Sequence, residues 1–384
     1  MTGGAFGSMA AQLFHLTSTE RKTQLVTGAA AGMSATFASP IAAAMLAAEL
    51  LLFEWKPRSL IPVALGSAVA AVIRRYLLGL GPLFPVPAHP ANISPEGLMF
   101  CAFAGLLAGV LSAALTSFVY WSEDLFHKLP IHWMWWPAVG GLIIGLGGFI
   151  FPQALGVGYE TIGNLMEGDV PGNIIIGTLI VKSAIWALAL GSGTSGGVLA
   201  PLLMIGGALG GVESMFFPNE GIAFWPLISM GAILGGTMRV PFTAVIFALE
   251  LTHDFNAFLP LFIAVIVAYA FTVLVMKRSI LTEKISRRGL HLSREYAIDP
   301  LEILFVREVM RTDVVTLPKG AEVAELFQKM RTADSGQRLF PVLDDNQRLT
   351  GVLTLRDVGN LEQDTVTLDD VMAPKRSRCP ATSR

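Results

Sequence analysis

One uncharged stretch of the chain carries the residue types needed to hold an anion with its backbone. It comprises Gly191, Ser192, Gly193, Thr194, Ser195, Gly196, Gly197, Val198, Leu199, Ala200 and Pro201, and it interrupts an apolar region. Glycine lets a ligand approach the backbone closely, and a helix expected to begin near Val198 offers unpaired N–H groups at the positive end of its dipole. Such a site binds an anion without lysine or arginine, weakly enough for release. The alternative is that these glycines serve close packing of helices.

Two glutamates, Glu49 and Glu250, lie in apolar surroundings, each nine residues after a proline, Pro40 or Pro241. Charge inside a membrane is costly, so such a residue is by default a candidate for function. The alternative is a structural carboxylate at a helix end or in a fixed pair. Because the same spacing occurs twice, we favour the structural interpretation.

Membrane-spanning helices are expected to position these residues. Apolar residues make up 53% of the 384 residues and charged residues only 15%, with a mean hydropathy of +0.60. A soluble domain carries roughly 25% charged residues. The windows without any Asp, Glu, Lys or Arg are residues 98–121, 133–159, 183–212, 221–238 and 255–276. A span needs about 20 apolar residues, and the prolines and glycines that interrupt these windows are typical of transporter and channel bodies.

The charged residues are concentrated in the C-terminal part. Residues 1–276 carry 22 charged side chains and residues 277–384 carry 34. Lysines and arginines follow the last long window, which predicts a cytoplasmic tail by the positive-inside rule. The net charge of −2 argues against nucleic acid as a partner. There is no His-Glu-x-x-His pattern and no Cys/His cluster, so we expect no metal site and no enzyme.

An internal repeat relates the two halves of the apolar part. The pattern Gly-Gly-Ala-x-Gly at residues 3–7 recurs at 206–210, and the Gly-x-x-x-Gly pattern at 28–32 recurs at 231–235, both at an offset of 203. Paired repeats are the usual architecture of secondary transporters, with the site at the repeat interface. The counterpart of residues 191–201 would precede Met1, so we expect a glycine-rich segment with a glutamate upstream.

The tail has the pattern of a small α/β unit. Residues 314–317, 339–343 and 349–353 are predicted strands, the last two joined by a turn at Asp344-Asp345-Asn346. Residues 321–330 have helical spacing. Val371-Met372 resembles Val309-Met310, which indicates the beginning of a second copy of the unit.

Three stretches of the apolar part resemble the family of CLC chloride channels and chloride/proton exchangers. They are residues 191–211, residues 238–255 and residues 27–50. The resemblance implies a homodimer of inverted repeats with one anion pathway per subunit. The fold class we expect is an all-α polytopic membrane protein of inverted repeats that lacks its N-terminal helices, followed by a small α/β cytoplasmic domain of CBS type. We expect residues 1–290 to form the membrane domain, with an incomplete first repeat, and residues 291–305 to form a linker.

The resemblance also assigns residues. It gives the anion-facing backbone amides to Gly197, Val198 and Leu199, and the family often has phenylalanine in place of Leu199. The family's pore tyrosine falls on Leu281, which leaves the inner gate without its phenol. The family's inner proton-transfer glutamate falls on Leu50, and leucine cannot relay a proton.

The resulting expectation is a chloride channel of the voltage-gated type that passes chloride and similar anions. The alternative is a chloride/proton antiporter. Less favoured are a membrane-embedded enzyme with a CBS tail and a non-conducting fragment. We expect a multi-pass protein of a bacterial inner (plasma) membrane, with chloride as the transported ligand and no resident cofactor.

The tail resembles a CBS domain over residues 306–361, with a truncated second copy at 362–384. Thr354 and Asp357 match the Thr-x-x-Asp pattern with which some CBS domains hold the ribose of an adenine nucleotide. The alternative is a helix N-cap with a solvated acid. CBS domains normally act in pairs, so the incomplete second copy weakens the expectation of nucleotide binding.

Overall fold

The computed structural model describes residues 2–14, 16–79, 81–87, 89–90, 93–168, 170–194, 196–287, 314–318, 339–344, 346 and 348–354. The chain divides into two compact units, residues 1–296 and residues 297–384. We call the first unit the body and the second the tail. The predicted linker at 291–305, helix at 321–330 and second copy at 362–384 lie outside the described residues.

The body is built from helices. They are α1 (Thr2–Gln12), α2 (Ser18–Phe37), α3 (Pro40–Leu46), α4 (Pro57–Leu78), α5 (Pro95–His127), α6 (Trp136–Ile150), α7 (Tyr159–Glu167), α8 (Gly172–Gly177), α9 (Ser183–Gly191), α10 (Leu199–Glu213), α11 (Phe224–Met238), α12 (Pro241–Thr252), α13 (Phe258–Val275) and α14 (Ile280–Arg287). The π-helical segment η1 (Ala47–Leu52) extends α3, and the π-helical segment η4 (Thr178–Lys182) joins α8 to α9. Three short 3-10 segments are η2 (Trp133–Trp135), η3 (Pro152–Ala154) and η5 (Phe255–Ala257).

The starts of several helices follow from local sequence. Thr17 and Glu20 form a reciprocal capping box at the start of α2, and hydrogen bonds from Thr17 lower the pKa of Glu20. Proline occupies the first turn of α3, α4, α5 and α12, where its missing N–H and fixed φ are tolerated.

Five helical stretches are long and apolar enough to cross a membrane: Pro57–Leu78, Pro95–His127, Trp133–Ile150, Gly172–Gly191 and Phe255–Lys284. The uncharged window 221–238 differs from the expectation of a full span. It forms the 15-residue helix α11, and every one of its residues is buried. Its hydropathy reflects the interior of the protein rather than contact with lipid.

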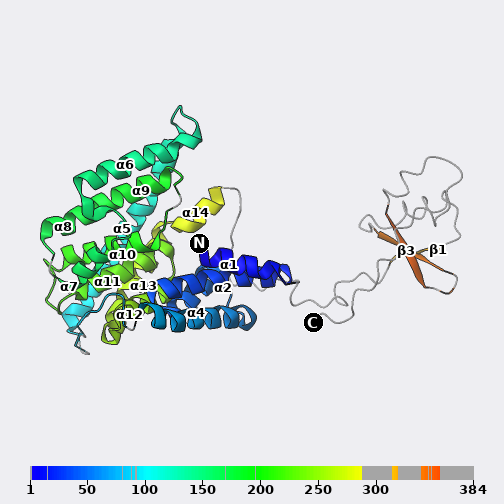
Figure 1. Ribbon diagram of the computed structural model, residues 1–384, viewed down its shortest axis with the longest axis horizontal. Helices are drawn as coiled ribbons and strands as arrows, with labels where there is room; N and C mark the ends of the chain where they lie inside the picture. The colour runs from blue at the N-terminus through cyan, green and yellow to red at the C-terminus, as the bar shows by residue number, and fades with distance from the viewer. Residues whose placement is uncertain are drawn as a thin grey trace. The chain divides into compact units, whose positions relative to one another are not determined.

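Figure 1 shows how the helices of the body are grouped. Helices α10, α11 and α13 lie in the middle, α6, α8 and α9 along one flank, and α1, α2 and α4 along another. Helix α5 packs against α9, α11 and α13 and so connects the middle to the flank of α6 and α9.

The repeat is visible in the backbone. In the first copy Ala38 has φ +58 and ends α2, and in the second copy Arg239 has φ +58 and ends α11. A residue with nearly the same backbone conformation in both copies follows, Ser39 (φ −121, ψ 75) or Val240 (φ −127, ψ 73), and the next helix begins at the proline after it. The left-handed ends recur again at Phe53 and His253, with φ +57 and +59.

The tail contains a three-stranded sheet in the order β1 (Leu317–Pro318), β2 (Leu339–Leu343) and β3 (Leu349–Thr354). Strand β1 pairs with β2 in parallel, and β2 pairs with β3 antiparallel, with Leu339 opposite Thr354. The two strands of the hairpin lie where the sequence predicts them. The first strand is shorter than the expected 314–317 and begins at Leu317.

Candidate functional site

The uncharged stretch 191–201 forms the connection between α9 and α10. Helix α9 ends at Gly191, and α10 begins at Leu199 with Val198 as its N-cap. The helix therefore starts within one residue of the predicted position. Its first internal hydrogen bond runs from the Leu202 N–H to the Val198 carbonyl at 3.2 Å.

The start of α10 leaves backbone donors available. No side chain caps it, and Pro201 has no N–H, so the Leu199 and Ala200 N–H groups have no partner within the helix. Val198 and Leu199 are half-buried, whereas Gly196 and Gly197 are exposed. Hydrogen-bond donors at the positive end of a helix dipole, beside an exposed glycine pair, are suited to an anion.

The glycines of this stretch have two different roles. A Cβ on Gly191 would lie 1.9 Å from the Ser122 Oγ of α5, so this glycine permits close packing. A Cβ on Gly197 would meet nothing within 4 Å, and one on Gly193, which has φ +78, would also meet nothing. Helix packing therefore accounts for Gly191 but not for Gly193 or Gly197.

Neighbouring side chains fix the shape of the connection. The Trp186 indole N–H of α9 donates to the Gly197 carbonyl at 3.2 Å. The hydroxyls of Ser192 and Thr194 both donate to the Ala189 carbonyl, at 2.7 and 2.5 Å. These bonds hold the loop against the end of α9.

Glu49 and Glu250 link the two repeats reciprocally. The Glu250 oxygens accept the N–H groups of Ile41 and Ala42, at 3.0 and 2.8 Å, at the start of α3. Glu49 of η1 accepts the N–H of Thr243 at 2.9 Å and its hydroxyl at 2.6 Å, at the start of α12. Each helix thus ends beside the start of the other, so α3 and α12 run antiparallel and the repeats are inverted.

The other site residues predicted from the sequence lie outside the α9–α10 connection. Leu281 is half-buried in the first turn of α14, and the preceding residue, Ile280, accepts the Tyr120 hydroxyl through its carbonyl. Leu50 is buried in η1 beside Glu49. Thr354 is the last residue of β3, and Asp357 lies outside the described residues.

Sequence analysis did not single out Lys182 and Glu213, which are buried ionisable residues apart from the buried His89–Asp254 pair. Lys182 of η4 donates through Nζ to the carbonyls of Ala154 and Gly156, both at 2.8 Å. Glu213, the last residue of α10, is 3% exposed. Lys182 and Glu213 are each an isolated charge in a long apolar stretch of the sequence. This isolation is the signal from which sequence analysis could have found them. In the part of the chain that the structure describes, no three metal-ligating side chains gather.

Comparison with known families agrees with this geometry. The model described as "Voltage gated chloride channel" matches residues 1–273, and the CBS domain model matches residues 306–360. The chain belongs to the CLC family.

Several CLC relatives are named exchangers. The H(+)/Cl(-) exchange transporter ClcA of Salmonella arizonae is 28% identical over 275 residues, which cover 68% of this chain and 58% of the relative. The ClcA proteins of Salmonella paratyphi B and Salmonella newport match over the same shares. The chain therefore spans 58% of the length of these curated CLC proteins.

Solved CLC structures share the fold. A slow cyanobacterial Cl-/H+ antiporter gives a TM-score of 0.66 at 24% identity and covers 74% of this chain and 69% of that chain. A CLC-type fluoride/proton antiporter gives 0.62 at 20% identity, covering 70% and 67%. The chain is thus a multi-pass membrane protein with a CLC body and a CBS tail.

Proposed function

We propose that this chain forms an anion pathway of a CLC transporter and that chloride is held by backbone N–H groups at the start of α10. The observation that carries this proposal is the exposed Gly196-Gly197 pair beside the N–H groups of Val198, Leu199 and Ala200, none of which has a partner within α10. The other residues of the motif have supporting roles. The loop is shaped by Gly191, Ser192 and Gly193, and Pro201 lacks an N–H and so adds no donor at the helix start.

We further propose that chloride movement is coupled to protons, which was the alternative in the sequence analysis. The relatives named above are exchangers, and this favours exchange over the channel that Leu50 suggested. The channel remains the second candidate, because a leucine at the position of the inner glutamate cannot relay a proton.

Reconstitution of the full chain into liposomes tests the two activities together. An imposed chloride gradient is expected to drive chloride flux and proton movement in a fixed ratio, read with a chloride electrode and a pH-sensitive dye. Chloride flux without proton movement would support the channel. Absence of any chloride flux from folded protein would contradict both candidates.

The backbone donors can be tested by removing one N–H at a time. Val198→Pro deletes an N–H at the N-cap, and the preceding Gly197 tolerates a following proline more easily than other residues. We expect chloride binding to weaken about tenfold to a hundredfold, since a hydrogen bond to a charged group contributes about 1.5–3 kcal/mol. Val198→Ala and Leu199→Phe keep the N–H groups and are expected to bind chloride normally. Equal affinity in Val198→Pro and Val198→Ala would contradict the backbone site.

Three further expectations belong to this proposal. The protein forms a homodimer in the membrane, its tail faces the cytoplasm of a bacterial inner membrane, and Thr354 with Asp357 contacts an adenine nucleotide. Cross-linking in membranes, accessibility of the tail to protease in sealed vesicles, and calorimetric titration of the full chain with ATP test them in turn.

A further inference from the structure

Glu213 is a buried carboxyl group whose hydrogen bonds are incomplete. It ends α10 and is 3% exposed. One carboxyl oxygen accepts the hydroxyl of Ser229 on α11. The other oxygen is buried and has no hydrogen-bond partner. No lysine, arginine or histidine of the described chain forms an ion pair with it.

The groups around Glu213 do not compensate a negative charge. Helices α8, α9 and α11, which pack against α10, carry no ionisable side chain. The buried thiol of Cys101 on α5 and the carboxyl group of Glu220 in the α10–α11 connection supply no positive charge. Glu220 is itself acidic and accepts the Ser94 hydroxyl.

The other elements packed against α10 bring no free cation to Glu213 either. Helix α7 contributes Tyr159, Glu160 and Glu167, none of them basic. Segment η4 contributes Lys182, whose Nζ is bonded to the carbonyls of Ala154 and Gly156. The rest of α5 adds only the exposed Glu96 near this end of the helix.

A charge at Glu213 would therefore be unfavourable for two reasons. Burying an ionised carboxylate without a cation costs several kcal/mol, and such groups become neutral instead. Glu213 also lies in the last turn of α10, where the helix dipole is negative and disfavours an anion. We propose that Glu213 is a proton-binding site, neutral in the packed body, and that loss of its proton loosens α10 from α11.

The packing around this turn shows how loss of the proton would act. A Cβ on Gly206 would lie 2.6 Å from the Met230 Cα of α11, and one on Gly210 would lie 2.1 Å from the Trp225 carbonyl oxygen. The two helices thus touch at backbone distance on the side of Ser229. A charge placed beside that contact has no room for water unless the helices separate.

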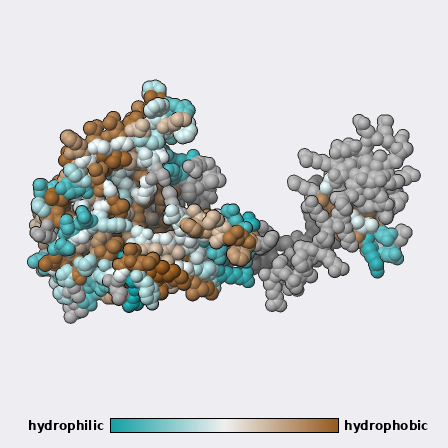
Figure 2. Space-filling view, viewed as in Figure 1, coloured by the Kyte–Doolittle hydropathy of each residue, from teal (hydrophilic) through white to brown (hydrophobic). Residues whose placement is uncertain are grey.

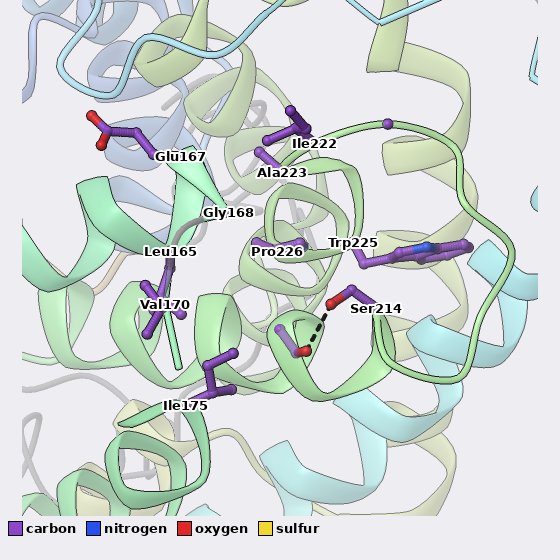
Figure 3. Close-up of a pocket in the computed structure, with 12 residues that line it drawn as sticks. Leu165, Glu167, Gly168, Val170, Ile175, Ser214, Ile222, Ala223, Trp225 and Pro226 are labelled. Atoms are coloured by element: carbon purple, nitrogen blue, oxygen red, sulfur yellow. Dashed lines mark hydrogen bonds between the residues drawn. The ribbon is translucent and has the colours of Figure 1, made fainter. Parts of the chain in front are cut away.

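The other flank of the same turn has free space. A cavity of about 250 Å³ lies there, lined by residues that include Leu165, Ile175, Gly211, Ser214 and Trp225. In Figure 3, Ser214 reaches this cavity from the end of α10 and donates to the Gly211 carbonyl at 2.8 Å. The end of α10 therefore borders free space beside its contacts with α7 and α8.

Infrared spectroscopy of the reconstituted full chain tests the proton directly. At neutral pH we expect a carbonyl stretch of a protonated, weakly hydrogen-bonded carboxylic acid that is absent in Glu213→Gln. Ser229→Ala should move this band to higher frequency, because the hydroxyl that donates to the carboxyl oxygen is removed. Glu160→Gln, at an exposed site on α7, should leave the band unchanged. A spectrum that is identical in wild type and Glu213→Gln would overturn the proposal.

The consequence for transport rests on the proposed function and is measured separately. Wild-type chloride flux should fall as the pH rises from neutral to alkaline, because above the midpoint the protonated fraction falls about tenfold per pH unit. Glu213→Gln, which mimics the neutral form, should keep its flux over the same range. An equally steep fall in both proteins would overturn the coupling of Glu213 to α10. Absence of flux in both, with the infrared band present, would instead contradict the proposed transport and leave the proton site supported.

Discussion

At the scale of single residues, Glu49 and Glu250 show how a carboxylate in apolar surroundings can be structural. Glu250 accepts two N–H groups, and Glu49 accepts one N–H group and a hydroxyl, at the first turn of a helix from the other repeat. A helix N-terminus carries unsatisfied N–H groups and the positive end of the dipole, and a carboxylate satisfies both. Both carboxylates are thereby compensated by backbone instead of by lysine or arginine, which distinguishes them from Glu213.

Removing the charge while keeping the oxygen tests this role. We expect Glu250→Gln to lower the free energy of unfolding by about 1–2 kcal/mol, because the amide oxygen still accepts one N–H but lacks the negative charge. Glu250→Ala, which leaves the Ile41 and Ala42 N–H groups without their acceptor, should cost about 2–4 kcal/mol. The measurement is thermal or denaturant unfolding in detergent.

The control for Glu250 is Glu160→Gln, which removes a charge from an exposed site. It should change the unfolding free energy by less than about 0.5 kcal/mol. If Glu250→Ala and Glu160→Gln were equally stable, the reciprocal capping would not contribute to the fold. Glu49→Gln should also lower the unfolding free energy, since Glu49 caps the start of α12 as Glu250 caps the start of α3.

At the scale of elements, the repeated glycines mark two helix crossings. In the first copy a Cβ on Gly28 of α2 would lie 2.1 Å from the Gly3 carbonyl oxygen of α1. In the second copy Gly206 and Gly210 of α10 approach α11 at similar distances. The Gly-Gly-Ala-x-Gly pattern of residues 3–7 and 206–210 is therefore the part of the repeat that lets each first helix touch the second through its backbone, whereas Gly231 and Gly235 of α11 face α12 and α13.

A single methyl group at this crossing should separate the helices. We expect Gly210→Ala to cost about 2–3 kcal/mol of unfolding free energy, because the added carbon overlaps backbone atoms that cannot rotate away. Gly145→Ala is the matched helical control on α6, where a Cβ meets nothing within 4 Å. That variant should be neutral or stabilised by up to about 1 kcal/mol. Equal melting temperatures for the two variants would contradict the close crossing.

The helices and strands also show which features of the fold the sequence can and cannot predict. The repeat, the helix start near Val198 and the hairpin of the tail follow from local patterns: glycine spacing, proline position and a turn between apolar runs. The burial of α11 does not follow, because hydropathy cannot distinguish lipid from protein interior. The partner of Glu213 does not follow either, because Ser229 reaches it only when α10 crosses α11.

At the scale of the whole molecule, the chain combines two units that suit two solvents. The body exposes many large apolar side chains, among them Leu142, Leu146, Phe149 and Ile150 of α6. Figure 2 shows such residues as brown patches over the surface of the body. Exposed apolar patches of this extent are unfavourable in water and indicate contact with lipid. The tail carries 26 of the 56 charged side chains within only 88 residues.

A pair of matched substitutions tests whether the surface of the body faces lipid and the surface of the tail faces water. Leu146 of α6 is 57% exposed and Leu339 of β2 is 59% exposed, so arginine has similar space at both positions. In lipid, Leu146→Arg should cost about 3 kcal/mol of insertion free energy and reduce the amount of protein retained in washed membranes. In water, Leu339→Arg should leave that amount unchanged, because a surface substitution usually costs under about 0.5 kcal/mol. Quantitative blotting of the membrane fraction measures both, and equal retention of the two variants would mean that α6 does not face lipid.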